Sequence, residues 1–351
     1  MPCTRVAALG GPKGFRAVMS RSTARRAFLG IGLALGVILL ILAFKGVDPS
    51  ALMAALTRTD PRFVALGLVT VGATIGAKAL RWKLLFYPSH DNLRLRSLVS
   101  ALLIGQTMNF LLPARLGELA RAYLIGEAEG KHKLFAFGTI VVEKLLDGLM
   151  LLLLLAVLFL VMPLPDWLRV PGATTGLILA SLLAAVLLLS GQRERILGAL
   201  DRVCQHLPVL KQLGLRQRLG DLADSLNSLR ATDVNIRLLL WSLAVWLLAG
   251  LTNYLTLLAL QIEVPLLVAS LFVLVVIHLG LVVPSSPARI GVFHYLCVLS
   301  LSVFGVEGSL ALAYGFILHF IVVVPVIFVG IFCVWRENLS LYRVVTEVDR
   351  K

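Results

Sequence analysis

Long apolar runs alternate along this chain of 351 residues with shorter segments that carry most of its charge. Several runs approach or exceed the roughly 20 residues that a helix needs to cross about 30 Å of hydrocarbon. Because hydrocarbon excludes unpaired backbone polar groups, such runs predict an all-α, polytopic helical membrane protein. We expect about six full spans, at 27–44, 62–86, 134–162, 173–190, 236–260 and 309–334.

Two further apolar segments are interrupted and do not fit a full span. One runs into PARLGELARAYL at Pro113, and the other into PARIGVFHYLCV at Pro287. Each motif places an arginine beside proline and glycine, where a membrane segment should end or turn. We expect re-entrant helical hairpins at about 97–127 and 265–304, because non-helical backbone at this depth must be buried in protein or line a wet cavity.

The order of spans and hairpins predicts an inverted repeat. Each half reads span, span, hairpin, span, and the two halves start on opposite sides of the membrane. We expect a first membrane repeat at 27–162 and a second at 163–334. Transporter sites lie where such paired, broken segments meet near the midplane. The alternative is a chance similarity of five residues in apolar sequence of low complexity.

The net charge of +14 bears on partners and on orientation. In a soluble domain it would favour nucleic acid. Here 59% of residues are hydrophobic, so the basic residues are those of cytoplasmic loops, and no nucleic acid partner is expected. We expect the inner (plasma) membrane, both termini in the cytoplasm, and contacts with anionic lipid. The cytoplasmic parts are a basic tail at 1–26, an amphipathic segment at 191–235 and a tail at 335–351.

The spacing of the cysteines and the lack of a glycine-rich phosphate-binding motif argue against a metal site, a disulfide framework and nucleotide hydrolysis. Cys3, Cys204, Cys297 and Cys333 form no CxxC pair and no Cys/His cluster at metal spacing. The sequence has no Walker A motif, so we do not expect ATP hydrolysis by this chain. We expect no metal site, no disulfide framework and no cofactor.

The span at 134–162 carries three charged residues where hydrocarbon is expected, namely Glu143, Lys144 and Asp147. One charge at the centre of a span costs about 3 kcal/mol on insertion scales, so each needs a partner. Glu143 and Asp147 share a helix face. Either an ion network joins the hairpins to this span, or a polar cavity accepts a headgroup or a coupling ion. The two can coexist, because a buried ion pair alone adds little stability.

The first hairpin carries Asn109, Arg115, Glu118 and Arg121. From Pro113 onward the pattern favours a helix, whose N-terminus attracts anions. An arginine guanidinium there would bind phosphate oxygens with two hydrogen bonds. We therefore expect a lipid phosphate site. The alternative is that the two arginines merely extend to the cytoplasmic interface.

The second hairpin offers Ser285, Ser286 and Arg289 on the same reasoning. Prolines break the helix there and a glycine permits close backbone approach. The residues expected to set the geometry of both hairpins are Pro113, Gly117, Pro284, Pro287 and Gly291.

Four other polar residues in apolar surroundings have open interpretations. His278, His294 and His319 are more typical of hydrogen-bonded core residues than of proton relays. Arg81, followed by Trp82, could reach inward or anchor the span at the interface.

These motifs resemble one known family. NFLLPARLGELAR at 109–121, VVEKLLDG at 141–148, RW at 81–82 and the late PARIGV resemble the lysylphosphatidylglycerol synthase transmembrane region, a flippase-like family, over about 27–335. That family usually has arginine after the glutamate of VVEKLLDG, where this chain has Lys144. The substitution keeps the charge but loses the bidentate geometry.

The resemblance implies translocation of a phospholipid. In two-domain members of the family, this region resembles a translocator for an aminoacylated phospholipid that a fused soluble domain makes. This chain ends shortly after Arg336, so the resemblance implies a separate synthase partner rather than synthesis. The residues that carry over by position are Asn109, Arg115, Glu118, Arg121, Glu143, Lys144, Asp147 and Arg289.

We therefore expect a lipid flippase or transporter rather than an enzyme. It would move a phospholipid or lipid-linked headgroup between leaflets through a polar cavity between two inverted re-entrant hairpins. Two alternatives stay open: a membrane enzyme that acts on lipid-linked substrates, and a non-catalytic membrane accessory subunit.

Overall fold

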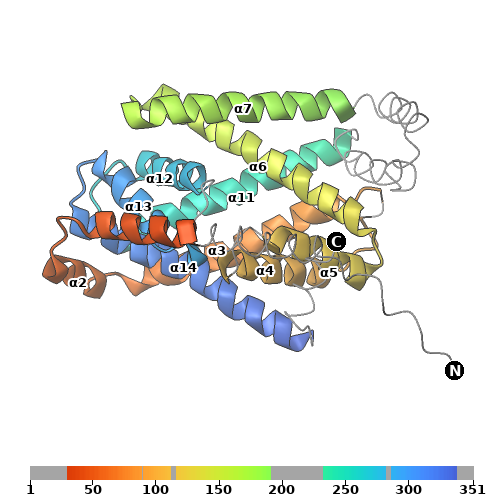
Figure 1. Cartoon of the computed structure of the whole chain (residues 1–351), viewed down its shortest axis with the longest axis horizontal. Coiled ribbons are helices and arrows are strands. Elements are labelled where there is room, and N and C mark those ends of the chain that lie inside the picture. The colour runs from red at the N-terminus through yellow and green to blue at the C-terminus, as the bar shows by residue number, and fades with distance from the viewer. Residues whose placement is uncertain (1–29, 89, 112–115, 191–231, 282–285, 338–351) are drawn as a thin grey trace, which may run out of the picture.

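The protein is a bundle of helices (Figure 1). The computed structural model describes residues 30–88, 90–111, 116–190, 232–281 and 286–337. Every regular element in those ranges is helical, which confirms the all-α class. The expected cytoplasmic segment at 191–235 and both tails lie almost wholly outside the described residues.

The helices follow the apolar runs of the sequence with small differences at their ends. After an unlabelled first helix, Gly30–Phe44, the elements are α2 (Pro49–Thr57), α3 (Pro61–Leu84), α4 (Leu95–Leu111), α5 (Leu116–Glu129), α6 (Lys133–Val161), α7 (Asp166–Ser190), α11 (Thr232–Ala259), α12 (Leu266–Gly280), the 3-10 turn η3 (Pro287–Arg289), α13 (Val292–Ser302) and α14 (Gly308–Arg336).

Four described helices are long and apolar enough to cross a membrane: α3, α6, α11 and α14. A fifth candidate is a bent pair, because the first helix and α2 meet at 89°. The sequence pattern did not predict α2, which begins with Pro49 after the capping side chain of Asp48. The chain is thus a multi-pass membrane protein. The described candidates do not include α7, which lies along one edge of the molecule beside α6 (Figure 1).

Two glycines let α4 and α5 pack closely in the first hairpin. A Cβ on Gly105 would lie 2.8 Å from the carbonyl oxygen of Gly117, and it would overlap the side chain of Arg121. The N–H of Gly117 donates to Oδ1 of Asn109 at 2.8 Å. Asn109 thus links α4 to α5 within the hairpin. The connection at 112–115, with Pro113 and Arg115, lies outside the described residues.

The second hairpin, α12 and α13, turns through an unusual backbone at η3. Ala288, Arg289 and Gly291 have φ values of 53°, 61° and 91°, a region that favours glycine. A Cβ on Gly291 would overlap the backbone of Gly36 in the first helix, so that helix packs directly on the turn. Pro284 and Ser285 lie outside the described residues.

The two hairpins meet. The guanidinium carbon of Arg289 lies 5.4 Å from the ring centroid of Phe110 in α4. Ala288 packs against the apolar cluster that contains Phe110 and Val326. The hydroxyl of Thr107 donates to the carbonyl of Val326 at 3.0 Å, so α14 holds α4 from another side.

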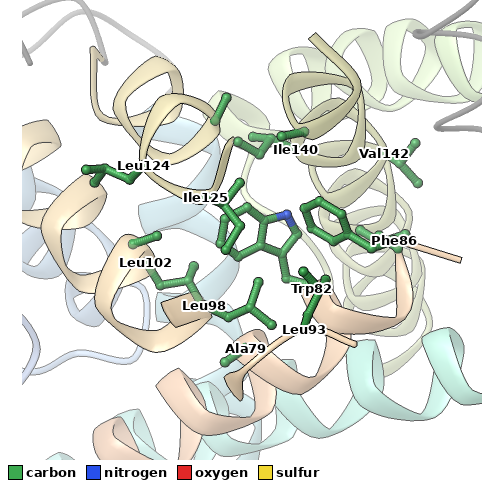
Figure 2. Close-up of a cluster of buried hydrophobic side chains, with 14 of the residues drawn as sticks. Ala79, Trp82, Phe86, Leu93, Leu98, Leu102, Leu124, Ile125, Ile140 and Val142 are labelled. Atoms are coloured by element: carbon green, nitrogen blue, oxygen red, sulfur yellow. The ribbon is translucent and has the colours of Figure 1, made fainter. Parts of the chain in front are cut away.

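The largest side chain of the core, Trp82 on α3, is fully buried among α4, α5 and α6 (Figure 2). Its Nε1–H donates to the hydroxyl of Thr139 at 2.9 Å, which fixes the rotation of the indole. Phe86 packs edge-on against it at 5.7 Å between centroids. The face of this indole contacts the guanidinium group of Arg121 on α5.

Substitution of Gly105 by alanine tests the close packing of the first hairpin. We expect Gly105→Ala to lower the free energy of unfolding by about 1–3 kcal/mol, because its methyl group overlaps neighbouring atoms. Gly72→Ala on α3 is the matched control, since no atom lies within 4 Å of its added Cβ. Thermal unfolding in detergent measures both. Equal stability of the two variants would contradict the packing.

Paired cysteines test whether the hairpins meet in a bilayer. In a chain without its native cysteines, we expect Phe110→Cys and Arg289→Cys together to be linked by a short bifunctional maleimide, because these side chains are in contact. Each single variant serves as control. Failure to link the pair with any of several bifunctional reagents of increasing length would refute the contact.

Candidate functional site

The centre of the charged cluster is Glu143 on α6, whose residue surface is 2% exposed. Arg121 on α5 approaches it with two nitrogens: Nη2 lies 2.6 Å from Oε2, and Nη1 donates to Oε1 at 3.4 Å. Arg81 on α3 adds Nη2 at 3.6 Å from Oε1. One carboxylate therefore lies between two guanidinium groups.

Arg81 connects three helices and is fully buried. Its Nη1 lies 2.8 Å from Oδ1 of Asp147, one turn beyond Glu143 on α6. The same nitrogen donates to the hydroxyl of Ser242 on α11 at 3.3 Å. The sequence left Arg81 open between an interfacial anchor and an inward position, and the structure places it inward. Glu143 and Asp147, two acidic residues in the apolar span at 134–162, need positive partners, and this need could have identified Arg81 from the sequence.

Arg121 is also buried, at 4% exposure, so its extension to the cytoplasmic interface is wrong. Its guanidinium carbon lies 4.2 Å from the ring centroid of Trp82. A cation over an indole face is attracted by the ring, most strongly where water is excluded. Gly105 makes room for its stem. Arg121 thus binds Glu143 on one side and rests on an aromatic wall on the other.

Lys144 belongs to an outer ion pair rather than to the buried core. Its Nζ lies 3.7 Å from Oε1 of Glu118 on α5, and the two side chains are 52% and 17% exposed. Such partly exposed pairs contribute at most about 1 kcal/mol. Glu118 and Arg121 both reach α6, but they bind different partners there, Lys144 and Glu143.

The cluster carries more positive than negative charge. Four basic and three acidic side chains take part: Lys78, Arg81, Arg121, Lys144, Glu118, Glu143 and Asp147. Within the described part of the chain, Nε and Nη2 of Arg81 and Nε of Arg121 make no hydrogen bond, and neither do two carboxylate oxygens, Oε2 of Glu118 and Oδ1 of Asp147. A buried donor without an acceptor is costly, so the cluster has chemical capacity for an additional anionic acceptor.

The remaining predicted residues divide between the second hairpin and undescribed positions. Ser286 donates to the carbonyl of Ile290 at 2.5 Å, which closes the turn on itself. Arg289 lies at the contact with α4 rather than against Glu143. Arg115 and Ser285 lie outside the described residues, as do the two prolines at 113 and 284.

Two of the histidines singled out in the sequence, His294 and His319, lie together at the turn of the second hairpin. Nε2 of His319 lies 2.8 Å from the carbonyl of Ala288, and its ring is 5.0 Å from that of His294. Nδ1 of His294 lies 3.5 Å from the N–H of Gly291, while its Nε2 has no partner among the described residues. In the same part of the chain, no three His, Cys, Asp or Glu side chains are grouped to hold a metal ion.

Removal of the central negative charge tests the network. We expect Glu143→Gln to lower the free energy of unfolding by about 3–5 kcal/mol, because two buried guanidinium groups lose their shared carboxylate. Glu118→Gln is the matched control, with an expected loss below about 1 kcal/mol, since its pair is partly exposed. Thermal and denaturant unfolding in detergent give both values. Equal losses would show that Glu143 does not hold the helices together.

Comparison with known proteins supplies the family. The family described as the lysylphosphatidylglycerol synthase TM region matches residues 29–330. A UPF0104 membrane protein of Methanothermobacter thermautotrophicus is 24% identical over 80% of this chain and 86% of its own length. A second UPF0104 membrane protein, from Methanocaldococcus jannaschii, is 30% identical over 31% of this chain and 33% of its own.

Another relative has a different name. A protein named glycosyltransferase AglD, from Haloferax volcanii, is 28% identical over 35% of this chain, and the match spans only 20% of that protein. No solved structure matches. The family match covers most of the chain and includes every residue of the buried ion network. The chain therefore belongs to the family of the lysylphosphatidylglycerol synthase transmembrane region.

Proposed function

We propose that this protein binds a lipid that carries an anionic phosphate and moves its headgroup between leaflets. The observation that carries the proposal is the pair of buried guanidinium groups of Arg81 and Arg121, three of whose N–H nitrogens make no hydrogen bond among the described residues. Charged groups at membrane depth are costly, and they mark substrate or ion pathways. A phosphate supplies negative charge and oxygen acceptors to which these N–H groups can donate.

In this proposal the carboxylates of Glu143 and Asp147 occupy the arginines when no lipid is bound. A phosphodiester that enters would compete for the same N–H groups, because carboxylate and phosphate both fit the guanidinium fork. The ion network that joins α3, α5 and α6 would then loosen as the headgroup binds. Binding and helix movement would be coupled through the same hydrogen bonds.

The proposed membrane arrangement is the one that the sequence pattern predicts. It has six full spans, two hairpins that enter from opposite faces, repeats at 27–162 and 163–334, and cytoplasmic termini in the plasma membrane. The contact between Arg289 and Phe110 supports it, since hairpins from opposite faces must meet near the midplane to form one site. The proposed lipid site includes Asn109, Arg115, Glu118, Lys144, Ser285, Ser286 and Arg289 around the central network.

A second candidate function is an enzyme on lipid-linked substrates. The relative named a glycosyltransferase favours it, although the match covers 123 residues. Such an enzyme would use Glu143 or Asp147 as acid or base and would need a soluble donor. Both carboxylates are already bound to arginines, so neither is free to exchange a proton with a substrate without first breaking an ion pair.

Lipid movement in reconstituted liposomes tests the proposal. Fluorescent phospholipids with anionic, zwitterionic and cationic headgroups would report translocation by the wild-type chain. We expect Arg81→Lys to slow anionic lipids at least about tenfold, because lysine keeps the charge but loses the two-pronged hydrogen bond. Arg169→Lys on α7 is the matched control, since Arg169 forms an exposed pair with Asp166.

Each other result has a defined meaning. If no phospholipid moves in wild-type liposomes, even with an imposed proton gradient or potential, translocation is refuted. If lipids move equally with Arg81→Lys, the buried network is not the headgroup site. If product formation from a lipid-linked donor is detected instead, the enzyme is favoured.

A further inference from the structure

A second polar layer lies one helical turn away from the Arg81 network. On α3, Lys78 precedes Arg81 by three residues, and on α11, Trp246 follows Ser242 by four, so each pair shares a helix face. On α6, Asp147 follows Glu143 by four residues, and it joins the two levels because it also binds Arg81. One turn corresponds to about 5–6 Å. The layer is further from the helix ends at Leu84, Lys133 and Thr232 than the network is.

His278 of the second hairpin completes this layer. Its ring lies 4.7 Å from that of Trp246, measured between centroids, at 45°. The charges of Lys78, Asp147 and Arg289, on three other elements, are close enough to act on it. Its side chain nevertheless keeps accessible surface, so a ligand can reach it. Polar side chains from the first half of the chain (Lys78 and Asp147) and from the second half (Trp246 and His278) thus lie near one another.

Trp246 and His278 offer one donor and one acceptor side by side. Trp246 is 6% exposed, and its Nε1–H has no acceptor among the described residues. Nδ1 of His278 lies 2.8 Å from the carbonyl of Leu274. A carbonyl only accepts, so Nδ1 carries the hydrogen of the neutral ring and Nε2 presents a lone pair.

A hydroxyl group matches this pair. It accepts from the indole N–H and donates to the imidazole lone pair with the same oxygen. A phosphate oxygen only accepts and would face the lone pair of Nε2. An ammonium group only donates, so it leaves the indole N–H without an acceptor; Lys78 and Arg289 repel it, while Asp147 attracts it. An uncharged headgroup with hydroxyls, next to a phosphate held by the arginines, satisfies every group.

We propose that Trp246 and His278 form a subsite that recognises a hydroxyl on the headgroup of the bound phospholipid. This inference rests on the proposed lipid function and adds the class of headgroup. The phosphate would lie at Arg81 and Lys78, and the hydroxyl one turn away, at the edges of the two rings that carry the indole N–H and Nε2. Neither aromatic residue belongs to the repeated motifs, and neither carries a formal charge in this state.

A pair of lipids that differ only in hydroxyls tests the subsite. Dioctanoyl phosphatidylglycerol and phosphatidylpropanol have the same charge and nearly the same headgroup size. Their affinities for the full chain in detergent are measured by native mass spectrometry. We expect the wild type to prefer the glycerol lipid about three- to tenfold, the range for one or two net hydrogen bonds.

Two variants assign the preference to residues. Trp246→Phe removes the N–H but keeps an aromatic ring, and we expect it to abolish the preference while propanol-lipid affinity stays the same. His278→Leu is expected to do likewise. Trp335→Phe is the matched control, since Trp335 is 73% exposed at the end of α14. Thermal unfolding confirms that each variant is folded.

The other outcomes overturn the inference. Equal wild-type affinity for both lipids rejects it, as does a preference that survives both variants. Equal loss of both lipids in folded Trp246→Phe would make Trp246 a packing residue. Displacement of lipid by equimolar glycerol phosphate would assign the site to a soluble ligand. Movement of lipids in liposomes without a hydroxyl preference rejects the subsite alone, whereas binding of neither lipid rejects the proposed function as well.

Discussion

The described structure depends on one carboxylate held between two arginines inside a membrane protein. Glu143 brings Arg81 and Arg121 together from helices that are distant in the sequence, and Asp147 and Ser242 bind the far side of Arg81. In hydrocarbon no water can replace these partners, so the network fixes the relative rotation of α3, α5, α6 and α11 as long as no other ligand takes the place of the carboxylates. Removal of one partner leaves a buried charge without a counter-ion, which destabilises the protein more than replacement of the whole pair by apolar side chains.

Small residues and one indole make this ion network possible. Gly105 leaves space for the stem of Arg121, and Trp82 supplies the surface on which its guanidinium rests. Thr139 then orients Trp82 from α6, the helix that also carries Glu143. The apolar cluster around Trp82 and the charged cluster therefore pack as one unit, in which the side chain of Arg121 fills space in the core.

The turn of the second hairpin shows how the two halves are joined. Three residues with positive φ turn the backbone sharply, His319 binds one of its carbonyls, and the first helix packs against Gly291. This brings Arg289 to α4 and His278 to the charges of α3 and α6. Side chains of the two halves of the chain thereby come into contact.

The sequence by itself determined the class, the approximate helices and the need for partners. Run length and hydrophobicity are local properties, so the spans near 62–86, 134–162, 236–260 and 309–334 correspond to described helices. The acids at Glu143 and Asp147 were identifiable because charge in an apolar run is exceptional. Only the tertiary structure decided that Arg81 is their partner, that Lys144 faces outward, and that Trp246 adjoins His278. Such pairs depend on the rotation and depth of helices relative to one another, which the spacing of residues within one helix does not encode.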